Sequence, residues 1–234
     1  MRALWAILLV PAASSAGFEP DRRVKQPTGQ DWEWVAGGRL PTAYDSRRQR
    51  YQFFAPATYK PAREWPLVVW LPAGDEPAGW PALEKACTEK DWFFASPFAC
   101  GAGRPANVRA RLALDLLDSI RKDHRIDPSR TYLVGQGAGG ELACRLAFSL
   151  PELFGGVAVL DAEAALPALA HLRHRLKDRL SVALVGKDRH AEGLLRDLAV
   201  RSKRWDDRKD LPAALAWMEE GRDARLADHR VWRV

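Results

Sequence analysis

The spacing of apolar residues changes along the chain at about residue 66. Residues 17–49 are polar and rich in turn formers, except for DWEWV (31–35), whose alternating pattern predicts a lone strand. YQFFAP (51–56) predicts a second strand, and PLVVWL (66–71) is an unbroken apolar run typical of a strand buried on both faces. We therefore expect two antiparallel strands that lead into a mostly parallel sheet.

Predicted strands and helices alternate after this point. In the segment 107–124, the apolar residues Ala113, Leu116, Leu117 and Ile120 recur at i, i+3, i+4 and i+7, which predicts a helix. The same reasoning predicts further helices at 80–87, 141–150, 164–175 and 192–201, and strands at 91–97, 131–135, 155–161 and 179–186. The alternation indicates an α/β fold, a three-layer α/β/α sandwich with helices on both faces of the sheet.

We expect a single main domain over residues 50–221. Residues 17–49 would form an N-terminal extension with the first strand, and residues 222–234 a C-terminal tail. No strand is visible between residues 189 and 211. The last strand of the sheet is therefore either missing or hidden in RSKRWDDRKD (201–210).

The first residues, MRALWAILLVPAASSAG, have the layout of a secretory signal peptide. One basic residue precedes an apolar run, and the small residues that follow end in Ser14-Ser15-Ala16, which suits a cleavage site. A short membrane anchor is the alternative, but the run falls well short of the ~20 residues that span a bilayer. We expect residues 1–16 to be removed on export to the periplasm or outside the cell, leaving no membrane span.

Charge and cysteine content exclude several kinds of site. The net charge is +6 and the isoelectric point about 9.4, but acidic residues are interleaved with the basic ones, so we expect no nucleic-acid binding. Cys87, Cys100 and Cys144 allow at most one intrachain disulfide, and whether Cys87 pairs with Cys100 stays open. None of the three has metal-ligand spacing, so we expect no metal ion and no cofactor.

The motif GQGAGG (135–140) has two interpretations. Gly135, Gly137 and Gly140 satisfy the G-x-G-x-x-G pattern of a nucleotide-binding turn, and Asp161 ends the next predicted strand, where a ribose-binding acid belongs. Alternatively, the segment is a nucleophile elbow, G-x-S-x-G, whose serine has become Gly137. The predicted export and the late position of the motif in the chain favour the elbow.

The sequence around this motif resembles a known fold family. APATYKPAREWPLVVWLP (55–72) and RIDPSRTYLVGQGAGGELACRLAFSLPELFGGVAVL (125–160) are similar to secreted α/β-hydrolase-fold esterases and peptidases, namely feruloyl-esterase-like, polyhydroxyalkanoate-depolymerase-like and prolyl-oligopeptidase-type catalytic domains. The resemblance extends over residues 51–185. It implies an α/β-hydrolase-like sheet in which strand 131–135 leads into the nucleophile elbow.

The resemblance also implies that the catalytic groups are degenerate. The nucleophile position matches Gly137, which has no side chain, and the oxyanion-hole remnant would be Ala73, Gly74 and Ala138, where the preceding proline has no N–H to donate. The remnant acid would be Asp188, which equally suits a helix N-cap. His190 lies beside that acid and His229 follows the last helix, so neither takes the place of the family's histidine.

We therefore expect an exported relative of serine esterases and peptidases that has lost hydrolase activity. Its remaining role would be to bind a glycan, ester or polymer in the old cleft, or a protein partner. The turn of Gly137, Ala138, Gly139 and Gly140 suits an anionic group, because it precedes a helix N-terminus. The alternatives are an active ester hydrolase or peptidase with a non-standard nucleophile, Ser96 or Cys100, and a nucleotide-binding domain that uses GQGAGG.

Overall fold

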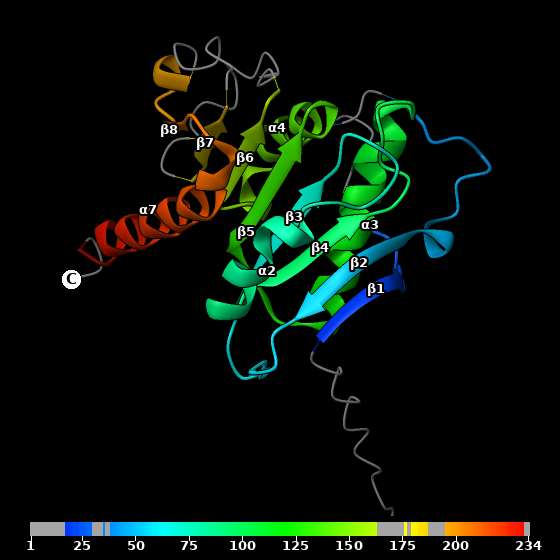
Figure 1. Ribbon diagram of the computed structural model, residues 1–234, viewed down its shortest axis with the longest axis horizontal. Coiled ribbons are helices and arrows are strands. Elements are labelled where there is room, and N and C mark those ends of the chain that lie inside the picture. The colour runs from blue at the N-terminus through cyan, green and yellow to red at the C-terminus, as the bar shows by residue number, and fades with distance from the viewer. Residues whose placement is uncertain are drawn as a thin grey trace, which may run out of the picture.

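A computed structural model describes residues 17–29, 35, 38–162, 176, 179–186 and 195–231. Within these residues one sheet of eight strands has the order β1-β2-β4-β3-β5-β6-β7-β8 (Figure 1). β1 and β2 are antiparallel to their neighbours, and the other strands are parallel. The strands are β1 (Gly17–Arg23), β2 (Arg50–Ala55), β3 (Trp65–Leu71), β4 (Phe93–Pro97), β5 (Ile126–Gln136), β6 (Gly156–Leu160), β7 (Ser181–Val185) and β8 (Arg201–Trp205).

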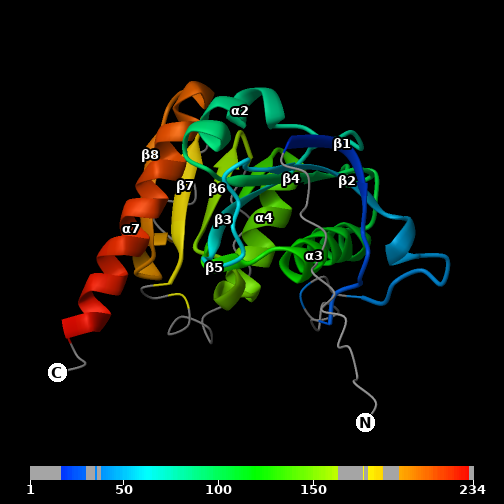
Figure 2. The same cartoon turned by 90° about the horizontal axis from the view of Figure 1, so that it is seen from below.

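Helices cover both faces of this sheet, which confirms the predicted three-layer sandwich (Figure 2). α3 and α4 pack on one face, and α2 and α7 pack on the other. The helices are α2 (Trp80–Glu89), α3 (Ala106–Asp123), α4 (Ala138–Ser149) and α7 (Leu211–Val231), with short 3-10 helices η1 (Ser46–Arg48), η2 (Pro151–Leu153) and η4 (Arg208–Asp210). α7 thus continues through most of the expected C-terminal tail.

The apolar run of β3 follows from its place between these two layers. All seven of its residues are buried. Leu67, Val69 and Leu71 pack with α3 and α4, whereas Val68 and Trp70 pack with α2 and α7. Because each buried side chain of this size contributes roughly 1.5–3 kcal/mol to folding, a strand inside a covered sheet has no position for a polar residue.

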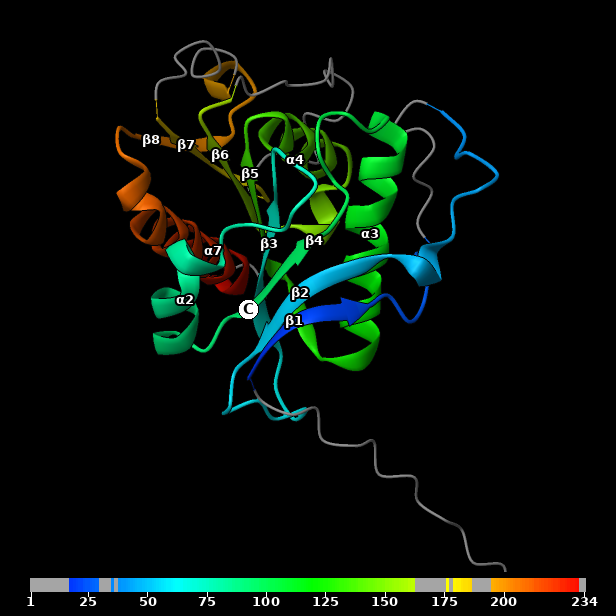
Figure 3. The same cartoon turned by 45° about the vertical axis from the view of Figure 1, so that its right-hand side comes forward.

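The ends of the sheet differ from the sequence-based expectation (Figure 3). The first strand is β1 (Gly17–Arg23); the strand expected at 31–35 lies outside the described residues apart from Val35, which has helical backbone. The last strand is present and was hidden in RSKRWDDRKD: β8 pairs in parallel with β7. Helix 192–201 therefore ends before Arg201, where β8 begins, and helix 164–175 lies outside the described residues.

The N-terminal extension is held to α3 by acidic side chains of that helix. The fully buried Asp115 carboxylate accepts hydrogen bonds from Thr28 N at 2.6 Å and from Tyr44 Oη at 3.0 Å. Nearer the end of α3, Asp123 accepts from Arg22 Nη2 at 2.7 Å. These contacts join segments about 70 to 100 residues apart, so the extension is part of the same folded unit.

Candidate functional site

The turn between β5 and α4 has the backbone of a nucleophile elbow. Gly137 has φ 53° and ψ −126°, a backbone conformation with positive φ that residues other than glycine rarely adopt. Its N–H donates to Leu160 O of β6 at 3.1 Å, which fixes the turn against the next strand. The residue at this position therefore projects above the carboxyl ends of β5 and β6, where parallel sheets gather their functional groups.

The other glycines of GQGAGG are required by close packing. A Cβ at Gly139 would overlap the Leu71 carbonyl at the end of β3, and a Cβ at Gly135 would overlap the backbone of Gly139 and Gly140. A Cβ at Gly137, in contrast, would meet only Ala73 Cβ, at an ordinary 3.4 Å. The outer glycines thus let strand and helix approach each other, whereas the middle position has space for a side chain that it lacks.

Three neighbouring strands end in the same way at this edge of the sheet. Gly137, Asp161 and Gly186 follow β5, β6 and β7 directly, and all three have positive φ, at 53°, 45° and 104°. The N–H of each donates to the last residue of the next strand, Leu160, Val185 and Trp205 respectively. The Asp161 side chain therefore lies one strand away from Gly137, in strained backbone that is costly for a residue with a Cβ.

Asp161 forms an ion pair with Arg208, from η4 in the segment that follows β8. Arg208 Nε donates to Asp161 Oδ2. Both side chains are partly exposed, at 59% for Arg208 and 33% for Asp161. The segment between β8 and α7 is the place where the resemblance puts the catalytic histidine, and its residues 206–210 read DDRKD. An arginine, which stays protonated at neutral pH, cannot act there as a general base.

The expected oxyanion-hole residues lie at two places. Ala73 faces Gly137, and Ala138 follows it in α4, so these two residues flank the elbow. Gly74 instead packs against Gly101 in the loop after β4, and the neighbouring Asp75 accepts the Gly101 N–H at 3.0 Å. That hydrogen bond lowers the pKa of Asp75. The two loops are joined again by the bond from Ala102 N to Ala73 O at 3.1 Å.

Two N–H groups of the expected anion-binding turn already donate hydrogen bonds within the protein. Besides the bond from Gly137, the Gly140 N–H donates to Gly137 O at 2.8 Å. This leaves Ala138 and Gly139, the first residues of α4, as the N–H groups without an acceptor inside the helix. A pyrophosphate bound as in a G-x-G-x-x-G turn would have to displace these backbone bonds, and Asp161 is engaged by Arg208.

The two alternative nucleophiles are buried at the carboxyl end of β4. Ser96 has no exposed surface and its Oγ accepts the Ala78 N–H at 3.1 Å, which explains it as a structural contact. Burial raises the pKa of the Cys100 thiol to about 11, so the thiolate needed for attack is scarce at neutral pH. Neither residue has a histidine beside it among the contacts of the described residues.

The remaining predicted residues lie outside the described part of the chain or form no site within it. Asp188 and His190 lie outside the described residues, and His229 falls within the helical range of α7 with its side chain also outside them. Cys87, Cys100 and Cys144 are buried, and no disulfide joins any two of them. No cluster of potential metal ligands occurs among the residues that the structure describes.

The Asp161–Arg208 pair was not predicted as a unit. Asp161 stood out in the sequence only as a candidate ribose ligand, and Arg208 lies in the charged segment that hid β8. The two residues are 47 positions apart and come together because β6 and β8 end at the same edge of the sheet. Their opposite charges alone give no signal in a chain with 36 basic and 30 acidic residues.

Comparison with known proteins supports the fold. No family model matches the chain. Poly(3-hydroxyalkanoate) depolymerase C of Paucimonas lemoignei is 29% identical over 68 residues, a segment that spans 29% of this chain and only 15% of that protein. A solved thermostable esterase aligns with a TM-score of 0.55 and 20% identity over 77% of this chain and 61% of its own.

The fluorophosphonate-binding serine hydrolase F of Staphylococcus aureus, in its substrate-bound structure, aligns with a TM-score of 0.57 and 11% identity. This alignment covers 76% of the present chain and 95% of that hydrolase. At these identities the likeness establishes the arrangement of strands and helices and leaves the chemistry to be argued from the residues. The strand order, the elbow and these neighbours together show that the chain has the α/β-hydrolase fold.

Proposed function

We propose that this protein is an exported α/β-hydrolase-fold protein that has lost serine-hydrolase activity and now acts by binding. The observation that carries the proposal is Gly137: the elbow backbone is kept, with φ 53° and ψ −126°, and the nucleophile is missing. Loss of the nucleophile in serine hydrolases costs on the order of a million-fold in turnover. The binding partner would be a glycan, an ester or a polymer in the former cleft, or another protein.

The histidine position supports the same conclusion. Arg208 lies between β8 and α7, the segment to which the resemblance assigns the general base, and it pairs with Asp161, which follows β6 next to β5. A guanidinium cannot accept the proton of an attacking hydroxyl or water at neutral pH. Within the part of the chain that the structure describes, neither the nucleophile nor the base that acyl transfer requires is found at this edge of the sheet.

Export is proposed on the sequence alone. The leader-like residues 1–16 lie outside the described residues. No helix in the described part of the chain is long and apolar enough to cross a bilayer. N-terminal sequencing of protein recovered from the periplasm would test the proposal, because cleavage after Ala16 leaves Gly17 as the first residue; recovery of uncleaved protein in the cytoplasm would contradict it.

The loss of activity can be tested by restoring the missing groups. We expect wild-type protein to be inert toward short-chain chromogenic esters. Gly137→Ser should gain slow turnover, since a Cβ there fits against Ala73, and Gly137→Ser with Arg208→His should gain more, since it adds a base. Gly29→Ser serves as the matched control, because its Cβ would meet nothing within 4 Å and the residue lies in the N-terminal extension, against Asp118 of α3.

The outcomes separate the hypotheses. Turnover in wild type that withstands Gly137→Ala and disappears with Ser96→Ala would establish the alternative nucleophile and contradict the proposal. Folding must be checked by the melting temperature, because a side chain at φ 53° costs about 1–3 kcal/mol. Folded variants that stay inert leave loss of activity intact and indicate that the oxyanion site has changed as well.

A further inference from the structure

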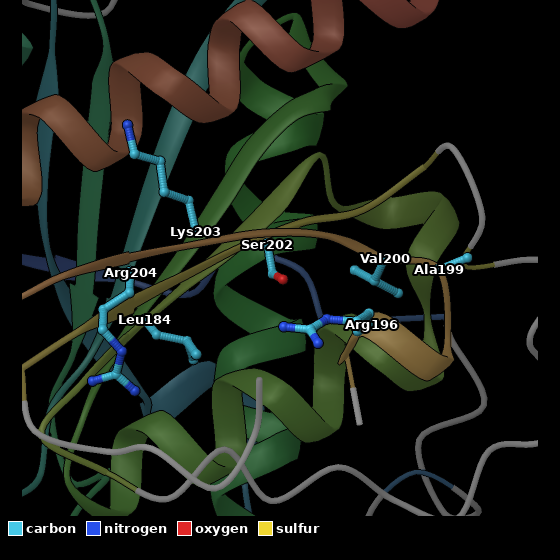
Figure 4. A pocket seen from close by; sticks show the side chains of 7 residues that line it. All are labelled: Leu184, Arg196, Ala199, Val200, Ser202, Lys203 and Arg204. Atoms are coloured by element: carbon cyan, nitrogen blue, oxygen red, sulfur yellow. The ribbon is translucent and has the colours of Figure 1, made fainter. Parts of the chain in front are cut away.

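The two edge strands of the sheet, β1 and β8, have different surroundings. A pocket of about 510 Å³ opens beside β8, lined by Ser202 and Arg204 of that strand (Figure 4). The Arg204 guanidinium is engaged there, because its Nη1 donates to Gly186 O at 3.0 Å. At the other edge, β1 passes beside α3 (Figure 3), and a buried histidine, His124, lies at the C-terminus of that helix. This histidine makes the β1 edge the place where contacts can respond to pH.

The chain at the end of β1 is tied to the last turns of α3. Asp123 of α3 accepts hydrogen bonds from Arg22 Nη2 at 2.7 Å and from Lys25 Nζ at 2.8 Å. One turn earlier in the helix, Ser119 Oγ accepts the Lys25 N–H at 3.1 Å. We call residues 17–25 the clasp, because they join the edge of the sheet to the end of α3.

His124 lies next to the clasp and has no hydrogen-bonded nitrogen. The Arg22 guanidinium lies over the Phe53 ring at 4.3 Å from its centroid, and the His124 ring stacks on the same phenyl at 5.2 Å. Both Arg22 and His124 are buried. Neither ring nitrogen of His124 has a hydrogen-bond partner among the described residues. A protonated ring would have two N–H groups and a charge to satisfy there, which burial makes costly.

The charged groups around His124 also oppose its protonation. Arg22 and Lys25 of the clasp are cations, and the Asp123 carboxylate is already shared between them. Glu19 of β1 pairs with Arg22 at 3.4 Å. Burial, and then the positive charge of Arg22, lower the pKa of His124 against the smaller opposing effect of Asp123. The other rings around His124, none of them charged below pH 7, are those of Phe53, Tyr59 and Phe93.

We propose that residues 17–25 form an acid-released clasp, which opens when His124 takes up a proton. With the clasp closed, the imidazolium would lie beside Arg22 on one phenyl ring, away from water; opening lets water reach both cations. Opening would also separate Phe18 from Trp80, whose rings are stacked at 4.7 Å, and leave β2 as the edge of the sheet. This inference does not depend on the loss of hydrolase activity.

Hydrogen exchange of the full chain, resolved by residue with NMR, can test the clasp. The reporter is the Val24 N–H, which donates to Gln49 O at 3.0 Å, and the reference is the set of amides in β6, at the centre of the sheet. After correction for intrinsic exchange rates, we expect Val24 protection to fall at least tenfold from pH 7 to pH 4.5. At both pH values, Val24 should be at least tenfold less protected than β6. Equal protection of Val24 and β6 would mean that the clasp opens only when the whole chain unfolds, and would overturn the proposal.

Two variants identify the group that takes up the proton. His124→Phe keeps an aromatic ring and removes the proton acceptor, so Val24 protection should change less than threefold over the same pH range. Asp21→Asn is the matched control, because it removes an exposed carboxylate of β1 that pairs with Arg50, and it should respond to acid like wild type. The proposal is wrong if His124→Phe loses Val24 protection with acid as wild type does.

A titration of wild-type protein decides the question even if His124→Phe does not fold. The ring proton resonance of His124 should titrate well below pH 6.5, with Val24 protection falling as the ring becomes protonated. A midpoint near pH 6.5 while Val24 stays protected would show that the closed clasp accepts the imidazolium, and the proposal would be overturned.

Discussion

Gly139 is the elbow residue that depends most strictly on its neighbours. Its α-carbon faces the Leu71 carbonyl so closely that a methyl group would overlap it. We expect Gly139→Ala to lower the free energy of unfolding by about 3 kcal/mol or more, because backbone on both sides would have to move. Gly103→Ala, which meets nothing within 4 Å, should be neutral or slightly stabilising in the same urea titration. Equal stability of the two variants would contradict the close packing of β3 and α4.

His124 is a buried titratable residue at the opposite end of the molecule from the elbow. It caps the C-terminus of α3 and lies 5.2 Å from Phe53, 5.0 Å from Phe93 and 5.1 Å from Tyr59, measured between ring centroids. Neither ring nitrogen has a hydrogen-bond partner among the described residues. Burial, together with the positive charge of Arg22, lowers the pKa of His124 to about 4.

This histidine should make stability depend on pH in a defined window. The unfolded chain binds a proton at His124 near pH 6.5, and the folded chain does so only near pH 4. Stability is therefore full above about pH 6.5 and is lost as the pH falls toward 4, by on the order of 2 kcal/mol. Burial raises the pKa of the nearby Asp123 carboxyl, but hydrogen bonds from Lys25 and Arg22 outweigh it, so this pKa lies below its ordinary value and Asp123 stays charged through the window.

Replacing the ring isolates that contribution. His124→Phe keeps an aromatic ring in the cage and removes both unpartnered nitrogens, so we expect it to be as stable as wild type at pH 7 or more stable. Between pH 6.5 and 4, the variant should lose about 2 kcal/mol less than wild type in parallel urea titrations. If the two proteins lose stability equally as the pH falls, the pKa of His124 is the same in the folded and the unfolded chain, and the prediction is wrong.

At the scale of elements, the inner strands of the sheet could be predicted, whereas the two edge strands, β1 and β8, could not. β3 is recognisable because its whole sequence, WPLVVWL, is apolar. β8 reads RSKRW, has no fully buried residue and lies at the edge of the sheet, where charged side chains also prevent pairing with other chains. Although β8 pairs with β7, its residues do not alternate between apolar and polar, so the sequence pattern could not distinguish this strand from a loop.

The acidic residues of α3 make a prediction about the N-terminal extension. Asp115 is fully buried and accepts hydrogen bonds from Thr28 N, Tyr44 Oη and Arg111 Nε, the last at 3.0 Å. Asp115→Asn should destabilise the protein by about 3 kcal/mol, because it removes a buried charge whose partners stay in place. Hydrogen exchange at Thr28 should accelerate as well. Asp21→Asn, in an exposed pair with Arg50, should change stability by less than about 1 kcal/mol.

At the scale of the whole molecule, the sequence predicts the fold more completely than the site. Periodicity and the elbow segment are local, so they identify the sandwich and place Gly137 at the end of β5. The Asp161–Arg208 pair arises only when β6, β7 and β8 lie side by side. Residues brought together by the ends of distant strands have no characteristic spacing in the sequence, so this pair could not be predicted from it.

The three buried cysteines can test whether the molecule unfolds as one unit. Cys87 belongs to the layer of α2, whereas Cys100 and Cys144 belong to the layer of α3 and α4. All three are fully buried, and burial raises the pKa of Cys87 to about 12 and of Cys100 to about 11, so native protein should react negligibly with iodoacetamide.

In a urea series, the three cysteines should become labelled over the same concentration range, because both layers pack on one sheet. Mass spectrometry of the digested protein resolves the three sites, and the midpoint should coincide with the loss of tryptophan fluorescence. The melting temperature should be insensitive to reductant, because no disulfide joins these residues. Labelling of Cys87 at clearly lower urea than Cys144 would mean that the α2 layer opens first, and the sandwich would then be two cooperative units rather than one.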